Sequence, residues 1–460
     1  MRYEKYKPSG FDWIGDIPEH WEVKKLSYCF ETIGSGTTPK SSNLGYYNDG
    51  IYNWLQTGDL NDNEIIRTSR KITQDAVDDY STLRFYPIES IVIAMYGATI
   101  GKTGILKIET TTNQACCVLS KPKGVVSKYV FYWFNSVKKH IISMSYGGGQ
   151  PNINQEMIRF LKIQLPLPKE QTAIANYLDR KTAEIEELIS QKEQLLELYE
   201  EEKTALINQA VTKGLTADGK GLNDYVDFET NKKSSNQDNQ TNQGSRQFKD
   251  SGIEWLGKIP EYWEVKKLKY VSNIVLGKML TNSDKGNFHK RKYLRAANIE
   301  WLNVNIEDVK EMWFSNNELT RLSINENDLL VSEGGEVGRT CIWKNELEEC
   351  YIQNSVHKIT LNNSNNPHYY LYQFYLYGQK GAFDAIVNRI SIAHLTVEKI
   401  RDIDFPVPSF KEQTAIVQYI ETEISQINTK SEKTKKLIDL LGEYKQSLIS
   451  EVVTGKFKVI

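Results

Sequence analysis

The chain has 460 residues, of which 40% are hydrophobic and 25% charged, a composition typical of globular proteins and a length that allows two to four domains. Its net charge of −2 at pH 7 excludes a protein that binds nucleic acid through an overall positive charge. No run of 18 apolar residues occurs, which excludes a helical membrane span, and five cysteines without a CxxC pair favour a reducing compartment and predict a cytoplasmic protein.

The lead of the chain, residues 1–21, introduces a motif that returns later. Residues 9–26 read SGFDWIGDIPEHWEVKKL and residues 251–268 read SGIEWLGKIPEYWEVKKL, so the second copy begins 242 residues after the first. The same interval separates the KEQTAI segments at 169–174 and 411–416. The chain therefore contains an internal repeat whose ends match and whose middle has diverged. We expect the tryptophans and prolines of the lead to be packing anchors, and the alternative is a contact platform.

Residues 22–165 form the first variable block. Short apolar runs such as Ile91–Met95 alternate with Gly, Asn and Asp turns, which predicts a mixed α/β domain. The segment 97–103, GATIGKT, has three residues between its glycines where a phosphate-binding loop needs four. We therefore expect a tight turn between two strands there, and the alternative is a turn that presents its backbone and a basic tip to DNA. Residues 128–144 predict one amphipathic helix.

A long helix is predicted from Lys169 to about Thr212, after Pro166 and Pro168 have ended the first block. This segment contains no Pro or Gly and is rich in Glu, Lys, Leu, Ala and Gln, which favour helix. Apolar residues recur at steps of four and three, as in a coiled-coil seam, and the stripe returns 242 residues later. The predicted seam residues are Ile174, Leu178, Ile185, Leu188, Leu195, Leu206, Ile416, Ile420, Ile427, Leu437, Leu441 and Leu448.

The second half of the chain begins after a polar, low-complexity segment at 231–247, which predicts a flexible linker. A second variable block at 264–405 follows, and Pro406 and Pro408 close it as prolines closed the first. Each long helix has an apolar stripe that needs a partner, so we expect the two helices to pair. Because each helix starts from a different block, chain order makes this pair antiparallel.

These elements predict an α+β fold in which two mixed α/β domains are separated by two long helices that form an antiparallel coiled coil, with a pseudo-two-fold internal repeat. The predicted boundaries are 1–165 for the first domain with its lead, 166–214 for the central helix, 215–250 for the flexible polar linker, 251–405 for the second domain with its lead, and 406–460 for the C-terminal helix.

No residue pattern in the chain points to catalysis. The six histidines show no HExxH or paired ligand spacing. Neither an Asn-Pro-Pro-aromatic methyl-transfer motif nor a Gly-x-Ser-x-Gly elbow occurs. We therefore expect no catalytic residue, no metal site and no cofactor in this chain.

Basic and amide side chains lie near aromatic residues in both variable blocks. Arg and Lys pair with phosphates and guanine edges, whereas Asn and Gln pair with adenine. A single charged run is more often a solvated surface, but recurrence in both blocks favours nucleic-acid binding. The candidate DNA-binding residues are Lys40, Asn43, Tyr46, Lys102 and Gln150 in the first block, and Lys290, Arg291, Arg295, Arg339 and Arg389 in the second.

Several segments resemble the specificity (S) subunit of Type I restriction-modification systems. They are the lead motif and its echo, the helix openings LPLPKEQTAIANYLD and VPSFKEQTAIVQYIE, and the helix tails LINQAVTKGL and LISEVVTGKF. The resemblance covers the whole chain as architecture. It is strong in the leads and helices and weak in the variable blocks, and the long 231–247 linker departs from the family pattern.

The resemblance implies that each variable block is a target-recognition domain that binds one half of a bipartite, asymmetric site in double-stranded DNA, with the helices as a spacer. It also implies two DNA-methyltransferase subunits, which methylate adenine at N6, and ATP-dependent restriction endonuclease subunits as partners, with no catalysis in this chain and no membrane. The alternative is a non-enzymatic coiled-coil scaffold that links two protein-binding domains. A stand-alone nuclease or methyltransferase is disfavoured by the missing motifs.

Overall fold

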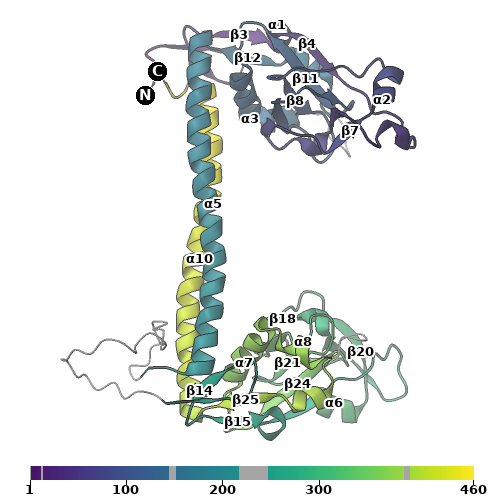
Figure 1. Cartoon of the computed structure of the whole chain (residues 1–460), viewed down its shortest axis with the longest axis vertical. Coiled ribbons are helices and arrows are strands. Elements are labelled where there is room, and N and C mark those ends of the chain that lie inside the picture. Colours follow the sequence, from purple (N-terminus) through teal and green to yellow (C-terminus); the bar gives the residue numbers. More distant parts are fainter. Residues whose placement is uncertain (1, 12–13, 145–151, 217–246, 388–393, 460) are drawn as a thin grey trace, which may run out of the picture. The chain divides into compact units, whose positions relative to one another are not determined.

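The chain is described from a computed structural model, which covers residues 2–11, 14–144, 152–216, 247–387 and 394–459. Its helices and strands, labelled in Figure 1, group into two compact units. The first unit contains Met1–Gln194 and Thr434–Ile460, and the second contains Leu195–Lys433. Among the described residues, no helix combines the length and the apolar character that crossing a membrane requires. Each unit is described separately below.

The first unit begins with two small antiparallel sheets. In the lead, β1 (Tyr6–Pro8) pairs with β2 (Asp16–Pro18), and β3 (Glu22–Lys25) then pairs with β12 (Lys162–Leu165). Because β3 and β12 lie at the two ends of the variable block, their pairing closes the block into one domain. The short helices α1 (Leu26–Cys29) and α4 (Gln155–Phe160) pack beside this closure.

The first variable block contains a five-stranded sheet in the order β4-β11-β8-β9-β6 and a three-stranded sheet in the order β10-β5-β7. The strands are β4 (Phe30–Ser35), β5 (Tyr52–Leu55), β6 (Asn63–Ile65), β7 (Arg70–Ile72), β8 (Ile91–Ala94), β9 (Thr103–Leu106), β10 (Thr111–Thr112) and β11 (Cys116–Pro122). The connections include the 3-10 turns η1 (Leu44–Tyr46) and η2 (Thr57–Asp59) and the helix α2 (Gln74–Asp79). The mixed α/β character predicted for this block is confirmed.

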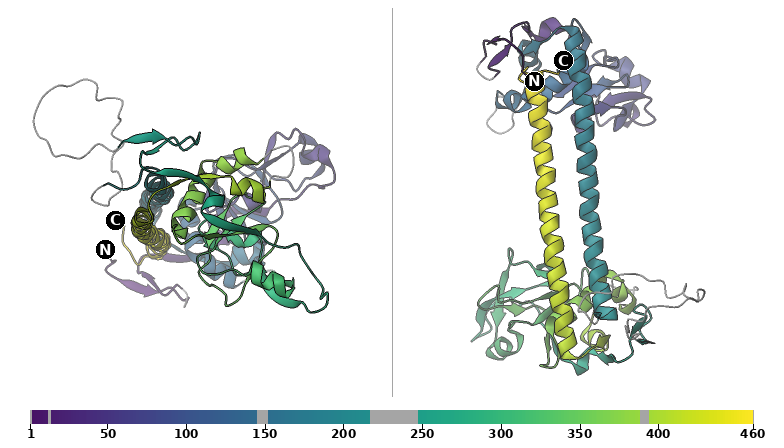
Figure 2. Two further views of the ribbon diagram at one scale, coloured as in Figure 1. Left: turned by 90° about the horizontal axis from the view of Figure 1, so that it is seen from below. Right: turned by 90° about the vertical axis from the view of Figure 1, so that its left-hand side faces the viewer.

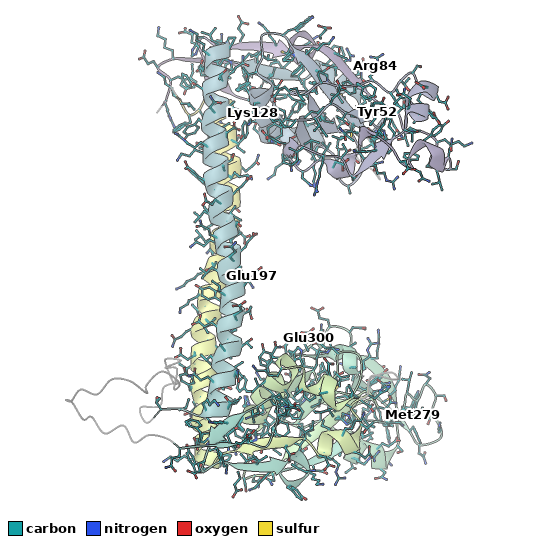
Figure 3. All side chains as sticks on the ribbon, viewed as in Figure 1. Tyr52, Arg84, Lys128, Glu197, Met279 and Glu300 are labelled. Atoms are coloured by element: carbon teal, nitrogen blue, oxygen red, sulfur yellow. The ribbon has the colours of Figure 1, made fainter. Side chains whose placement is uncertain are left out.

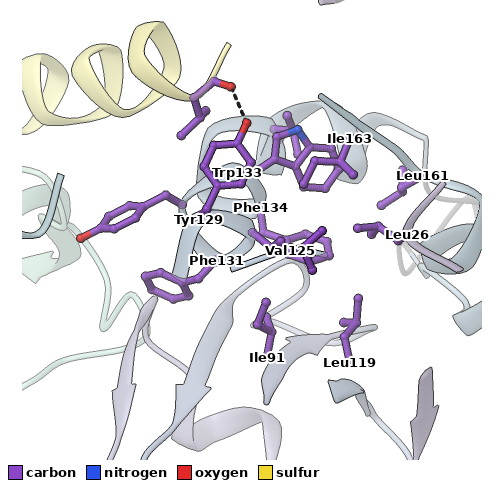
Figure 4. Close-up of a cluster of buried hydrophobic side chains, with 14 of the residues drawn as sticks. Leu26, Ile91, Leu119, Val125, Tyr129, Phe131, Trp133, Phe134, Leu161 and Ile163 are labelled. Carbon is purple, nitrogen blue, oxygen red and sulfur yellow. Dashed lines mark hydrogen bonds between the residues drawn. The ribbon is translucent and has the colours of Figure 1, made fainter. Parts of the chain in front are cut away.

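The core of the first block forms between the sheet and the helix α3 (Ser127–Ser143). Ile91 and Leu119 from the sheet face Trp133 and Phe134 from the helix (Figure 4). All four side chains are fully buried, which is the main stabilising contribution to a fold of this kind. The helix predicted at 128–144 is thus confirmed, and its apolar residues cover most of its circumference because it is enclosed by other elements.

The second variable block has two corresponding sheets, one of four strands in the order β16-β24-β21-β22 and one of three strands in the order β20-β17-β23. Its strands are β16 (Ser272–Leu276), β17 (His289–Leu294), β18 (Ile299–Glu300), β19 (Asn303–Val304), β20 (Lys310–Phe314), β21 (Leu329–Ser332), β22 (Thr340–Ile342), β23 (Tyr351–Ile352) and β24 (Val356–Leu361). Its helices and turns are η3 (Leu268–Tyr270), η4 (Ala296–Asn298), α6 (Asn316–Leu322), α7 (Pro367–Gln379), α8 (Ala382–Ile386) and α9 (Val397–Arg401).

The strand pair of the lead and the strand pair that closes the variable block both have counterparts in the second unit. The strand β13 (Phe248–Asp250) pairs with β14 (Lys258–Pro260), and β15 (Glu264–Lys267) pairs with β25 (Asp404–Val407). The repeat seen in the sequence is therefore a repeat of the fold. The predicted domain boundaries stay predictions, and residues 217–246, which make up most of the predicted linker, lie outside the described part of the chain.

Two long helices, α5 (Pro168–Lys213) and α10 (Phe410–Val453), pair in antiparallel fashion within each unit (Figure 2). In the first unit, the start of α5, with Ile174 and Leu178, shares a core with Leu448 near the end of α10. In the second unit, the end of α5, with Ile207, shares a core with Ile416 at the start of α10. The predicted antiparallel coiled coil is confirmed.

The seam of this pair differs from the prediction at two positions. Leu188 and Leu437 are 37% and 40% exposed, whereas the neighbouring Ile189 and Ile438 are partly buried. The prediction assumed 3.5 residues per turn, but a straight α-helix has about 3.6, so the apolar stripe moves around the helix by a residue along its length. Seven predicted seam residues are buried, namely Ile174, Leu178, Ile185, Ile416, Ile420, Ile427 and Leu448, and Leu195, Leu206 and Leu441 are partly buried.

Each block holds the end of a long helix with a buried tyrosine. The Tyr129 hydroxyl on α3 lies 2.7 Å from the Gln164 carbonyl and 3.1 Å from the Val453 carbonyl, and the second contact is drawn as a dashed line in Figure 4. The Tyr369 hydroxyl on α7 lies 3.4 Å from the Val211 carbonyl, and the Gln373 amide donates to the same oxygen at 2.8 Å. The last carbonyls of a helix have no partner within the helix, so these contacts stabilise both helix ends.

The leads are packing anchors, as expected. Trp21 and Trp263 are fully buried. The Trp21 indole donates to Glu170 at 3.3 Å, and the Trp263 indole donates to Glu412 at 3.2 Å. Both glutamates lie in the first turn of a long helix and belong to the repeated KEQTAI segment, where a carboxylate also interacts favourably with the helix dipole. Of the remaining lead tryptophans, Trp13 lies outside the described residues.

A buried histidine makes the stability of the second unit pH-dependent. His357 donates from Nε2 to the Leu395 carbonyl at 2.6 Å, its Nδ1 has no hydrogen-bond partner among the described residues, and burial lowers the pKa of its imidazole below the ordinary 6.5. Below pH 6.5 the unfolded chain therefore takes up a proton that the folded chain resists. We expect the free energy of unfolding of this unit to fall as the pH is lowered through the ordinary histidine pKa of about 6.5, measured by urea denaturation. The variant His357→Gln should flatten that dependence, and an unchanged pH slope in the variant contradicts the prediction.

Candidate nucleic-acid interface

Three predicted residues of the first block come together at η1. The Asn43 carboxamide oxygen accepts the Gly45 backbone N–H at 3.1 Å, which caps this turn. The Tyr46 hydroxyl donates to Asp79 at 2.7 Å and so ties the loop to α2. Lys40 is exposed, and no described residue pairs with its ammonium group. Asn43 and Tyr46 therefore shape the loop, while Lys40 is available to a polyanion.

The fourth predicted residue of the first block, Lys102, lies in the connection between β8 and β9. This confirms the predicted turn between two strands, and Gly97 and Gly101 adopt φ values of +84° and +74° there, which L side chains rarely adopt. The Lys102 ammonium donates to the Asn61 carboxamide oxygen at 2.8 Å. Lys102 is thus separate from the η1 loop, and Gln150 lies outside the described residues.

Two basic residues of the second block lie on β17 and pair with carboxylates. Lys290 contacts Glu311 on β20 at 3.0 Å, and the Arg291 guanidinium contacts Glu349 at 2.9 Å. The lysine and arginine side chains are 54% and 37% exposed. Because exposed ion pairs contribute little to stability, these pairs can exchange their carboxylates for DNA phosphates at small cost.

Arg295 and Arg339 of the second block meet at η4. Arg295 directly precedes η4 and pairs with Asp308. Arg339 lies in the connection between β21 and β22, and its guanidinium donates to the Ala296 carbonyl at 3.1 Å. The remaining candidate, Arg389, lies outside the described residues.

Carboxylates set the charge balance around these arginines. Hydrogen bonding and attraction from Lys310, together with the Arg295 guanidinium, hold the pKa of Asp308 below its ordinary value. Hydrogen bonds from Asn303 and Asn305, with a smaller contribution from Arg339, lower the pKa of Glu300, whose position Figure 3 labels. Both carboxylates are therefore ionised at neutral pH and partly cancel the positive charge of the surface.

The sequence alone does not indicate the acidic partners of these basic residues. Glu311, Glu349 and Asp308 are separated from their basic partners by at least a dozen residues along the chain. The strand pairing of β17 with β20 and the position of β23 bring them together. No short motif signals such contacts, because only the sheet register places the residues opposite one another.

A family model described as the Type I restriction modification DNA specificity domain matches the chain twice, over residues 18–198 and 260–438. The chain belongs to this family. The two matches correspond to the two copies of the internal repeat, each with its closure strands and part of a long helix. The resemblance to Type I specificity subunits is confirmed, and the scaffold alternative is not favoured.

Relatives that match along nearly their whole length are named as specificity subunits of Type I restriction enzymes. The Type I restriction enzyme MjaIX specificity subunit of Methanocaldococcus jannaschii is 26% identical over 470 residues, a match that covers 97% of this chain and 95% of the relative. The EcoKI specificity subunit of Escherichia coli K12 is 20% identical over 464 residues, covering 96% and 90%. Each match therefore covers nearly the whole of this chain and nearly the whole of the relative.

Solved structures share the fold. The crystal structure of the HsdS subunit from Thermoanaerobacter tengcongensis aligns with a TM-score of 0.57 and 14% identity, covering 96% of this chain and 98% of that one. A chain from a structural study of complex assembly and conformational transition in a type I R-M system aligns with a TM-score of 0.62 and 13% identity, covering 95% and 98%. At this identity the likeness concerns the fold alone.

Proposed function

We propose that this chain recognises a bipartite, asymmetric site in double-stranded DNA for a Type I restriction-modification complex in the cytoplasm. Each variable block binds one half-site, and the chain itself is not catalytic. The observation that carries the proposal is that one fold occurs twice, with matching frames but different polar residues on its connections. Two copies of one recognition domain that carry different side chains are suited to bind two different half-sites.

In this proposal the chemistry belongs to the partners. Two DNA-methyltransferase subunits methylate adenine, and restriction subunits cleave DNA with ATP. The basic residues at η1 and on β17 contact phosphates and fix the register on the duplex, while residues near η2 and η4 contact base edges. The modest net charge of the chain fits shared phosphate contacts with the methyltransferase subunits.

Genome-wide mapping of N6-methyladenine tests the proposal. The chain is co-expressed with its matching methyltransferase subunit in a host that lacks other adenine methylation. We expect one motif with two half-sites of different sequence. A constant number of base pairs of unspecified sequence, the unread gap, separates them. Methylation without a sequence motif, or a motif in one contiguous piece, contradicts the proposal. The purified complex should also lose affinity steeply as salt increases, because phosphate contacts release counterions.

The two long helices are proposed to set the length of the unread gap. Deleting one heptad from each helix, residues 188–194 and 430–436, keeps the flanking parts of the antiparallel pair in register. Seven helical residues rise about 10.5 Å, and DNA about 3.4 Å per base pair. We therefore expect the gap to shorten by roughly three base pairs, with both half-sites unchanged in the methylation map.

The matched control deletes residues 188–194 alone. This change puts the two helices out of register, so methylation should be lost at every site rather than moved to a shorter gap. If the double deletion methylates the original motif with its original gap, the helices do not set the spacing.

A further inference from the structure

Backbone hydrogen bonds align the two variable blocks residue by residue. In the first block the Asn113 N–H donates to the Leu55 carbonyl at 3.0 Å, and in the second the Gln353 N–H donates to the Leu294 carbonyl at the same distance. These bonds continue equivalent parallel pairings, β10 with β5 and β23 with β17. Leu55 and Leu294 are therefore equivalent, and so are the residues that follow them, Gln56 and Arg295.

A second set of bonds confirms the alignment at the neighbouring hairpin. The Ala94 N–H donates to the Lys102 carbonyl at 2.9 Å, and the Ser332 N–H donates to the Arg339 carbonyl at 2.8 Å. Each of these bonds lies where two antiparallel strands meet their connection. The strands are β8 and β9 in the first block and β21 and β22 in the second. Lys102 is thus equivalent to Arg339, although the sequences between these anchors have diverged.

The position after β5 or β17 has the same backbone in both blocks. Gln56 and Arg295 are both extended and both precede a 3-10 turn, η2 or η4. Their backbone N–H groups bond the side chain of the third turn residue, Asp59 at 2.9 Å and Asn298 at 3.1 Å. The backbone therefore presents two chemically different side chains from equivalent positions.

The surroundings of Arg295 hold its guanidinium in place. One terminal nitrogen pairs with Asp308, and the side chain is 33% exposed. The Nε–H is buried and has no hydrogen-bond partner among the described residues. Arg339 contacts the same turn through its bond to the Ala296 carbonyl. With one terminal nitrogen held by Asp308, the remaining terminal N–H groups of this partly exposed guanidinium are the donors that a ligand can reach.

We propose that this position determines one base in each half-site, with Gln56 binding adenine and Arg295 binding guanine. The inference rests on the proposed function and names the residues that distinguish its two halves. An arginine can bind guanine O6 and N7 through two donors, whereas a glutamine donates to adenine N7 and accepts from its N6 amine. Asp308 is a positioning residue in this scheme, because it orients Arg295 without contacting DNA.

The test is the methylation motif of exchanged variants, each co-expressed as the full chain with its methyltransferase subunit. Arg295→Gln should relax one guanine in one half-site or change it to adenine, and leave the other half-site unchanged. Gln56→Arg should change one adenine of the opposite half-site. For the purified complex on matched duplexes, the preference at the affected base pair should fall by roughly 5- to 150-fold.

Arg291→Gln is the matched control, because Arg291 lies on β17 four residues before Arg295 but pairs with Glu349. This variant should weaken binding equally on all duplexes and keep the motif. Asp308→Asn should lower the base preference at the Arg295 position while its melting temperature stays close to that of the wild type.

The outcomes separate the inference from the function on which it rests. If the wild-type chain directs methylation to no motif, the proposed function fails. If the wild-type motif is bipartite and both exchanges leave it unchanged, or both reduce methylation equally at every site, the inference is overturned and the function stands. A change in the same half-site for both exchanges also overturns the inference.

Discussion

Replacing Trp133 with alanine is expected to lower the free energy of unfolding of the first unit by about 3–5 kcal/mol. Trp133 is fully buried in the core shown in Figure 4, and its indole donates to the Gln164 carboxamide oxygen at 2.7 Å. The substitution leaves a cavity between α3 and the closure strand β12. It also removes the hydrogen-bond partner of the buried Gln164 oxygen, which adds to the loss.

Hydrogen–deuterium exchange measures this effect best, because two compact units need not unfold in one transition. Amides of α3 and β12 should exchange much faster in the variant, while those of the second unit serve as an internal reference. Trp133→Phe should lower the free energy of unfolding less than Trp133→Ala, because phenylalanine keeps most of the buried side-chain volume. Tyr28→Ala is the surface control, because Tyr28 is 70% exposed and its loss should change stability by less than about 0.5 kcal/mol. Equal exchange in Trp133→Ala and Tyr28→Ala contradicts the prediction.

Replacing Glu170 with alanine should release the lead of the first unit from α5, at a cost of about 2–4 kcal/mol. The buried carboxylate accepts from the Tyr3 hydroxyl at 2.7 Å and the Trp21 indole at 3.3 Å, and it contacts His20 Nε2 at 2.9 Å. Removing the carboxylate leaves the buried indole without an acceptor. The equivalent carboxylate of the second unit, Glu412, provides a comparison within the same chain.

Glu412→Ala should have a smaller effect, about 1–2 kcal/mol, because Glu412 accepts from Trp263 and from Tyr262, which is 59% exposed and can bond water instead. Limited proteolysis distinguishes the two variants. Cleavage within residues 2–11 should increase in Glu170→Ala, and cleavage within residues 247–263 should increase less in Glu412→Ala. The reverse order of sensitivity shows that the first lead does not depend on its carboxylate.

The candidate site was only partly predictable from the sequence. Lys40, Asn43 and Tyr46 are neighbours in the chain, so their proximity at η1 could be expected. The charge of Arg339 makes it a candidate from the sequence, but its bond to the Ala296 carbonyl links two connections far apart in the sequence. Nothing in the local sequence of Asp308 indicates that it pairs with Arg295.

The sequence by itself determined the repeat, the two long helices and the family. Helix propensity, proline boundaries and an apolar stripe are local properties, and matching motifs 242 residues apart need no structure to be recognised. The tertiary structure decided which seam residues are buried and which residues of the two blocks are equivalent. Strand pairing tolerates divergent side chains as long as backbone donors and acceptors stay in register. Backbone hydrogen bonds therefore identify Gln56 and Arg295 as equivalent, whereas the diverged sequences around them do not.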